Sequence, residues 1–299
     1  MSRLFSAFVI VDWSAAAKPS TGADSVWIGV LKRDARFRMK FESHNPATRS
    51  AAEALLTIIL DDFKKRSERV LLGFDFCLGF PRGFAKALNL AGDPPWQAVW
   101  TQVDKMVKDK TDNTNNRFGA ASEINRRLTG GPFPFWGCPP KDALTTLQPK
   151  RTRAHGPDDL PEFRLTEERT PGAASIWKLY YNGSVGGQTL LGIPAVRRLK
   201  QARGEGVKVW PFETGLKALT AADLDGAEVV VAEVWPSALK TLPAAGEVKD
   251  LAQVRAMAEH YARLDEGGKL GALFAAPKDL SAEGHEIAVR EEGWILPAT

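Results

Sequence analysis

Three apolar stretches that each end on an acidic residue constrain this fold more than any other feature of the sequence. The stretches and their terminal acids are residues 8–11 with Asp12, residues 70–74 with Asp75, and residues 229–232 with Glu233. Short uninterrupted apolar runs of this kind are typical of strands that are buried on both faces of a sheet. Because α/β sheets place their ligands at the carboxyl ends of the central strands, we expect the three acids to converge and form one functional site.

The N-terminal part of the chain predicts the element order β-β-β-α-β. A small polar loop over residues 13–22 follows the first strand, and two further strands are expected over 25–31 and 36–42. Ser50 is the expected cap of a helix, because Glu53 follows three residues later and an apolar stripe continues to Phe63. The strand that ends at Asp75 comes next.

The remainder of the chain is expected to complete one domain over residues 1–299. Short helical pieces alternate with Pro- and Gly-rich loops between residues 84 and 206, and we interpret this segment as an insertion that covers one edge of the site. The expected elements are helices over 96–108, 120–128 and 251–264, a strand over 207–212 and, at the tail, a terminal strand or strap over 287–296. The predicted class is therefore α/β, with a mixed sheet flanked by helices.

Composition excludes several classes of protein. The chain has 299 residues, of which 44% are hydrophobic and 25% charged, as is usual for a globular protein. It has no run of about 18 apolar residues, and its N-terminus lacks the pattern of a signal peptide, so we expect a cytoplasmic protein without a membrane partner. Cys77 and Cys138 form no C-x-x-C pair, which excludes a cysteine-based zinc site. The net charge of +4 is compatible with an anionic ligand but too small to indicate nucleic acid by itself.

The three strand-end acids are candidate ligands for Mg²⁺ or Mn²⁺. A carboxylate among apolar residues needs a cation or hydrogen-bond donors, and hard divalent ions prefer carboxylate oxygens held by several strands. The alternative for Asp12 is a turn cap that binds its own backbone, and Asp75 has the same alternative. Glu233 precedes Trp235-Pro236 and could instead face solvent on an edge strand.

Several other residues suggest a phosphate ligand more weakly. Ser14 and Lys18 lie in the loop after the first strand, but this loop lacks the paired glycines of a phosphate nest. Residues 183–188 are Gly-rich without a following Walker lysine, so a plain loop is the alternative. Arg117 could clamp a phosphate or could be a surface arginine. The four histidines show no metal-ligand spacing.

The motifs around the three acids resemble those of an uncharacterised bacterial family described as predicted nucleases of domain-of-unknown-function type. The resemblance rests on Val11-Asp12-Trp13-Ser14, on residues 73–81 and on residues 232–237, and extends to the middle of the chain only at Asn116-Arg117 and residues 183–188. It implies a ribonuclease H-like fold, a divalent metal ion, and nucleic acid or a nucleotide-like phosphate as the partner.

The sequence departs from this family where relatives carry a final acid on the last helix. Gly271 stands at the expected position, and Asp265, six residues earlier, could replace the acid if the helix bends at Gly267-Gly268. The leading hypothesis is metal-dependent phosphodiester hydrolysis by Asp12, Asp75, Glu233 and Asp265, with the first three as metal ligands. The alternatives are a non-catalytic or small-molecule-binding protein and a nucleotide-dependent phosphotransferase.

Overall fold

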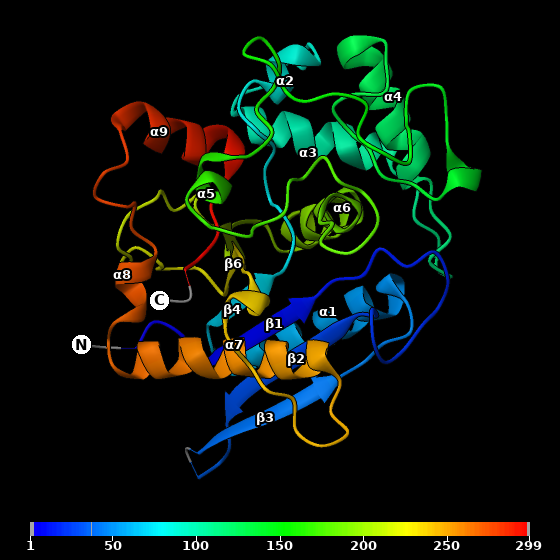
Figure 1. The fold of residues 1–299 in the computed structure, drawn as a ribbon. Helices are drawn as coiled ribbons and strands as arrows, with labels where there is room; N and C mark the ends of the chain where they lie inside the picture. Colours follow the sequence, from blue (N-terminus) through cyan, green and yellow to red (C-terminus); the bar gives the residue numbers. More distant parts are fainter. Residues whose placement is uncertain (1–2, 37, 298–299) are drawn as a thin grey trace.

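The computed structural model describes residues 3–36 and 38–297, and it has an α/β architecture built on one mixed sheet (Figure 1). The sheet has six strands in the order β3-β2-β1-β4-β6-β5. The strands are β1 (Ala7–Asp12), β2 (Trp27–Arg33), β3 (Met39–His44), β4 (Val70–Phe74), β5 (Val207–Val209) and β6 (Val229–Glu233). The predicted α/β class is confirmed, and the four strands predicted before residue 75 are all present.

The two halves of the sheet differ in strand direction. β1, β2 and β3 form an antiparallel meander, whereas β4 pairs with β1 in parallel, β6 pairs with β4 in parallel, and β5 pairs with β6 in parallel. β1 and β4 are joined through the helix α1 (Arg49–Lys65), as a parallel connection requires. The side chain of Thr48, and not the expected Ser50, caps this helix by accepting from the N–H of Ala51.

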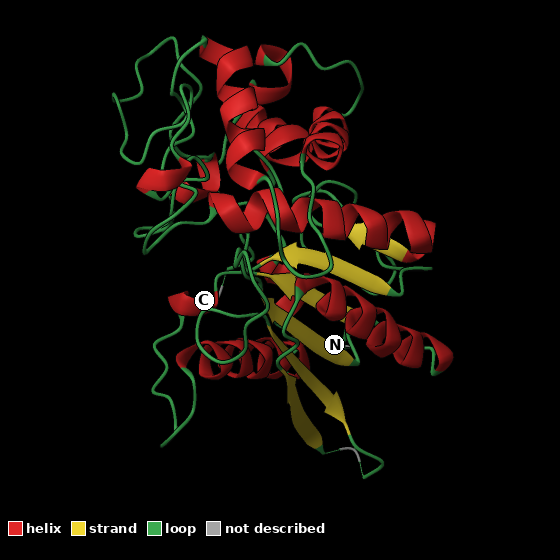
Figure 2. Cartoon of the chain, turned by 90° about the vertical axis from the view of Figure 1, so that its right-hand side faces the viewer, coloured by secondary structure: helices red, strands yellow, loops and turns green. Residues whose placement is uncertain are grey.

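Helices cover both faces of the sheet (Figure 2). The apolar side chains of α1 pack on one face together with the alternate residues Val9 and Val11 of β1. The helix α7 (Lys249–Glu266) packs on the other face, where it contacts β1 and β2 and where Ile10 of β1 points. Because side chains alternate along a strand, each central strand divides its residues between these two cores.

The predicted insertion, residues 84–206, contains helices and loops and contributes no strand to the sheet. Its elements are α2 (Phe84–Ala87), α3 (Pro95–Met106), α4 (Arg117–Thr129), the 3₁₀ turn Pro140–Asp142, α5 (Leu165–Glu168) and α6 (Gly186–Arg203). Trp96, Trp100 and Leu190 belong to the same hydrophobic cluster as Val9 and Leu72 of the sheet. The segment therefore shares a core with the sheet.

The structure shortens one expected strand near the C-terminus and excludes the strand alternative for the tail. β5 stops at Val209, since Pro211 has no N–H with which to continue the ladder. The tail, residues 287–296, is not a strand: α9 (Ala282–Ile287) continues into a π-helical turn, Ala288–Glu292, and only Ile295 bridges to Glu233 of β6. The remaining short elements are the 3₁₀ turns Gly204–Gly206 and Pro236–Ala238 and the helix α8 (Leu270–Leu273). Within the described residues, no helix has both the length and the apolar character needed to cross a membrane.

Candidate functional site

Asp12 and Asp75 form a carboxyl pair at the carboxyl ends of two adjacent parallel strands. Val11 of β1 is in register with Phe74 of β4, so the residues that follow them, Asp12 and Asp75, lie side by side. Because side chains alternate along a strand, both acids point to the face covered by α7. The N–H of Trp13 donates to Asp75 Oδ1 over 2.7 Å, and the N–H of Asp75 donates to the carbonyl oxygen of Val11 over 3.3 Å. Both acids remain partly exposed, so a ligand can reach them.

The environment of the pair favours the protonated carboxyl. Burial raises the pKa of Asp12 well above its usual value, and the charge of Asp75 and a hydrogen bond with it raise the pKa further. Burial also raises the pKa of Asp75, to about 6, against the opposing effect of hydrogen bonds from Asp12 and from the Trp13 amide. Two adjacent acids in one site therefore need a shared proton or a cation between them.

Two further acids, which the sequence analysis did not identify, extend this pair. The negative charges of Asp250 and Asp24 both act to raise the pKa of Asp12. Asp250 lies in the first turn of α7, and its Oδ2 accepts from the N–H of Asp24 over 3.0 Å. In the sequence, Asp250 is recognisable as an acid at the start of an amphipathic helix. In the structure, this end of α7 lies at the carboxyl edge of β1, next to the carboxyl pair.

A cavity of about 270 Å³ opens onto the carboxyl pair. Besides Asp12 and Asp75, its wall includes Gln253 of α7, the loop residues Gly183–Val185 before α6, and Gln188 in the first turn of α6. Cys77 also lines it, but burial raises the pKa of the Cys77 thiol well above its usual value, which disfavours a thiolate nucleophile. This volume is just below the usual range of ligand sites, about 300–1,000 Å³, so the cavity suits a compact group such as one phosphoester.

Glu233 lies in the same cavity wall but belongs to a buried ion-pair network. It is in register with Phe74, so its side chain leaves the sheet on the face opposite to Asp12 and Asp75. Arg164 donates to both of its carboxylate oxygens, over 2.6 and 2.8 Å, and the N–H of Leu78 donates over 3.1 Å. Burial raises the pKa of Glu233, and the charge of Arg164 opposes this effect. With its oxygens occupied, Glu233 is a structural residue and a poor metal ligand.

Asp265 does not belong to the site, and neither does Gly271. The Asp265 carboxylate accepts from the backbone N–H groups of Leu4 and Phe5 over 2.9–3.2 Å, at the amino end of β1. That strand rises about 17 Å between Ala7 and Asp12, at about 3.3 Å per residue. A Cβ at Gly271 would lie 2.3 Å from the carbonyl oxygen of Leu219 and 3.3 Å from Leu4, so there is no room for an acidic side chain. Gly271 also lies near the amino end of β1, away from the carboxyl pair.

Replacing Asp265 with alanine is expected to lower the free energy of unfolding by about 1–3 kcal/mol, because two buried amides lose their acceptor. Divalent-metal binding should not change. Urea denaturation measures the first effect and calorimetric titration with Mn²⁺ the second. Asp265→Asn keeps one acceptor and should cost less; loss of Mn²⁺ binding in a folded Asp265→Asn variant would return this residue to the site.

The other candidates from the sequence have ordinary structural contacts or lie beside the site. The Ser14 hydroxyl donates to the carbonyl oxygen of Asp24 and accepts from the N–H of Ala16, so it orders the loop after β1. The carbonyl oxygen of Lys18 accepts from Asn113. In residues 3–36 and 38–297, no group of three or more His, Cys, Asp or Glu side chains is close enough to hold a metal ion.

Comparisons with known proteins gave no relative for this chain. No family model matches it, and neither the curated proteins nor the solved structures yielded a match.

Proposed function

We propose that this protein is a metal-dependent phosphodiester hydrolase in which Asp12 and Asp75 bind Mg²⁺ or Mn²⁺. The observation that carries the proposal is the carboxyl pair itself. Asp12 and Asp75 lie side by side at the sheet edge, and the charges of Asp75, Asp250 and Asp24 all raise the pKa of Asp12. The charge of Asp250 also raises the pKa of Asp75. Such a pair fits a divalent cation, since carboxylate oxygens are the ligands that hard ions prefer.

The sheet topology supports the ribonuclease H-like fold that this proposal includes. An antiparallel meander followed by a helix and two parallel strands, with acids at the ends of β1 and β4, is the arrangement that the resemblance implies. β5 adds one strand at the edge beyond β6. The proposal differs from the sequence-based hypothesis in its acids, because Asp250 replaces Glu233 and Asp265.

Each residue has a defined role in the proposed reaction. Asp12 and Asp75 bind the ion directly, and Asp250 adds negative charge from α7 and becomes a ligand if its side chain turns toward the pair. A bound ion would lower the pKa of a water and polarise the phosphoryl group. The water oxygen would attack phosphorus, the water proton would go to solvent or an acid of the site, and the ester oxygen would leave with the electron pair of its bond to phosphorus.

Titration of the protein with Mn²⁺ at pH 8 tests this proposal. We expect saturable binding and hydrolysis of bis(p-nitrophenyl) phosphate that EDTA abolishes. Asp250→Asn is expected to weaken Mn²⁺ binding about tenfold, which corresponds to about 1.4 kcal/mol. Glu259→Gln, on the same helix, is the matched control and should bind as the wild type does.

Absence of Mn²⁺ binding to the folded wild-type protein would contradict the proposal. The small-molecule-binding and phosphotransferase hypotheses predict a different result, since a nucleotide or another small ligand would then raise the thermal unfolding midpoint without a metal requirement at Asp12 and Asp75.

A further inference from the structure

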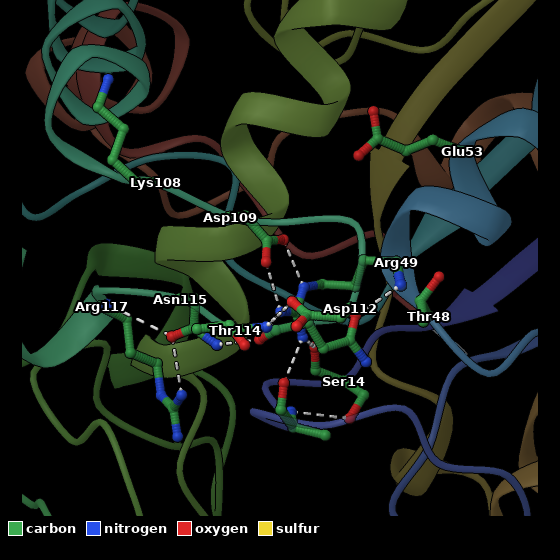
Figure 3. A network of polar contacts seen from close by, with 12 residues as sticks. Ser14, Thr48, Arg49, Glu53, Lys108, Asp109, Asp112, Thr114, Asn115 and Arg117 are labelled. Carbon is green, nitrogen blue, oxygen red and sulfur yellow. Dashed lines mark hydrogen bonds and ion pairs between the residues drawn. The ribbon is translucent and has the colours of Figure 1, made fainter.

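Two buried arginines lie beside the loop that follows β1, and only one of them has a carboxylate partner within the described residues. Arg49 forms a bidentate ion pair with Asp109, with both distances 2.6 Å, and also donates to the carbonyl oxygens of Ser14, Ala16 and Asn113. It is 1% exposed, and its guanidinium donors are used (Figure 3). An ion pair together with hydrogen bonds to the remaining donors offsets the cost of burying the Arg49 charge.

Arg117 is buried almost as deeply without such compensation. Its exposed fraction is 6%, and it forms no ion pair with any described residue. Within residues 3–36 and 38–297 its side chain forms one hydrogen bond, from Nη1 to Asn115 Oδ1 over 2.9 Å, and the buried Nε has no partner there. The guanidinium stacks on Phe118, 4.2 Å from the ring centroid, and turns away from Asp109 (Figure 3).

The electrostatic surroundings of Arg117 also favour an anion. Burial and then the positive charge of Arg49 lower the pKa of Arg117 to about 10, and the charges of Asp142 and Asp109 do not restore it. A buried guanidinium with free donors is costly unless an anion binds it. Arginine is well suited to a phosphate, because its N–H groups match two phosphate oxygens at once.

The Nε of Arg117 lies against the N-terminus of α6. A Cβ built on Gly187 would be 3.5 Å from Arg117 Nε and 3.1 Å from Ala15, so the first turn of α6, the loop after β1 and the guanidinium meet at one point. No side chain caps this helix at Val185. The N–H of Gly186 donates to the carbonyl oxygen of Lys178 over 2.9 Å, so the N–H groups of Gly187 and Gln188 are the ones that carry the partial positive charge of this 18-residue helix.

We propose that Arg117 and the first turn of α6 form a phosphate subsite next to the carboxyl pair. Val185 and Gln188 line the cavity that holds Asp12 and Asp75, and Gly187 between them adjoins Arg117, so the first turn of α6 links the guanidinium to the wall of that cavity. The subsite deepens the proposed hydrolase function and rests on it for its role in catalysis. It commits the substrate to a group with at least two oxyanion oxygens, as a phosphate has.

Phosphate binding in metal-free buffer tests the subsite independently of hydrolysis. Binding of inorganic phosphate and of a nucleoside monophosphate is measured by calorimetry in EDTA, with chloride added to constant ionic strength. Arg117→Met is expected to bind at least tenfold more weakly. Its unfolding midpoint in phosphate-free buffer should be unchanged or higher, because the substitution removes a buried charge that lacks a partner. Loss of binding for either probe supports the subsite. The probe that is affected shows whether the subsite binds free phosphate or the phosphate of a nucleotide.

The matched control is Arg126→Met, on the same helix, where the arginine is exposed and pairs with Glu123. If Arg117→Met does not fold, Arg117→Lys gives the same readout, because lysine keeps the charge but cannot bind two oxygens in one plane. Equal affinity of the wild-type and Arg117 variants for both probes, or no binding to the wild type, would overturn the subsite. Phosphate binding without any Mn²⁺ binding would overturn the proposed function and leave the subsite standing.

Discussion

Arg164→Met is expected to lower the free energy of unfolding by about 3–5 kcal/mol, the usual effect of removing one partner of a buried ion pair. Arg164 is 0% exposed and contacts Glu233 through Nη1 and Nη2, and Glu167 through Nε and Nη2, over 2.6–3.0 Å. Its Nη1 also donates to the carbonyl oxygen of Glu292 over 2.8 Å. Without the guanidinium, Glu233 and Glu167 would face each other as buried acids. Urea denaturation at pH 8 measures the loss.

A second substitution separates charge repulsion from lost packing. In the double variant Arg164→Met, Glu233→Gln, one of the two buried acids is neutral, so part of the lost stability should return. The single variant should also lose less stability at pH 5 than at pH 8, because the unpaired acids can then take up protons. Arg151→Met is the surface control: its pair with Glu162 is about one-third exposed, and we expect a change within about 0.5 kcal/mol. A similarly small effect in Arg164→Met would show that the network does not stabilise the fold.

The sequence was informative about the strands because each buried strand is an apolar run that ends at a polar residue. The ends of β1 and β4 were therefore predicted, and Asp12 and Asp75 are adjacent as expected. Register was not available from the sequence. A shift of one residue moves a side chain to the other face of a sheet, and this shift separates Glu233 from the pair. The partner of Glu233, Arg164, lies 69 residues away in the loop before α5, where no periodic pattern indicates it.

The direction of α7 explains why the sequence-based hypothesis includes Asp265 in the site and omits Asp250. α7 begins at the carboxyl edge of β1 and runs back along the sheet, so its first turn, with Asp250, is near the site. Asp265 is 15 residues further on, or about 22 Å at about 1.5 Å per residue. The sequence shows the apolar stripe of this helix, but the stripe is the same for either direction of the helix across the sheet. An acid in the first turn and an acid in the last turn are therefore equivalent until the structure is known.

Asp12→Asn is expected to abolish the response of the protein to Mn²⁺ and also to stabilise the metal-free protein at pH 8. The pKa values of Asp12 and Asp75 are both raised by folding, the latter to about 6, so the folded state holds protons that the unfolded state releases. The wild-type protein in EDTA should therefore lose stability as the pH rises from about 4 through 6 and beyond. For Asp75 alone the raised pKa corresponds to up to about 3 kcal/mol at pH 8.

The amide introduced by Asp12→Asn can donate to Asp75 as the protonated Asp12 does, but it carries no charge at any pH in this range. The pH dependence in EDTA should therefore become flatter, and the variant should be more stable than the wild type at pH 8 by at least about 1 kcal/mol. The same amide is a much weaker ligand than a carboxylate. Mn²⁺ should raise the unfolding midpoint of the wild type but not of the variant. Phosphodiester hydrolysis should fall by at least about 100-fold, because loss of a metal ligand costs more than loss of a residue that only hydrogen-bonds a metal ligand.

Thermal unfolding between pH 4 and pH 8, with EDTA or with Mn²⁺, distinguishes this outcome from a purely structural role of Asp12. Asp62→Asn is the control, since this acid is 54% exposed on α1 and pairs with Arg66. If Asp12 instead capped the turn after β1, its replacement would destabilise the protein at every pH and leave any Mn²⁺ effect unchanged. A wild-type protein that gains stability between pH 6 and pH 8 in EDTA would likewise contradict a proton-sharing pair. The opposite signs of the two effects, stabilisation without metal and loss of the metal response, follow from one cause, because the pair that disfavours two negative charges is the pair that a divalent cation neutralises.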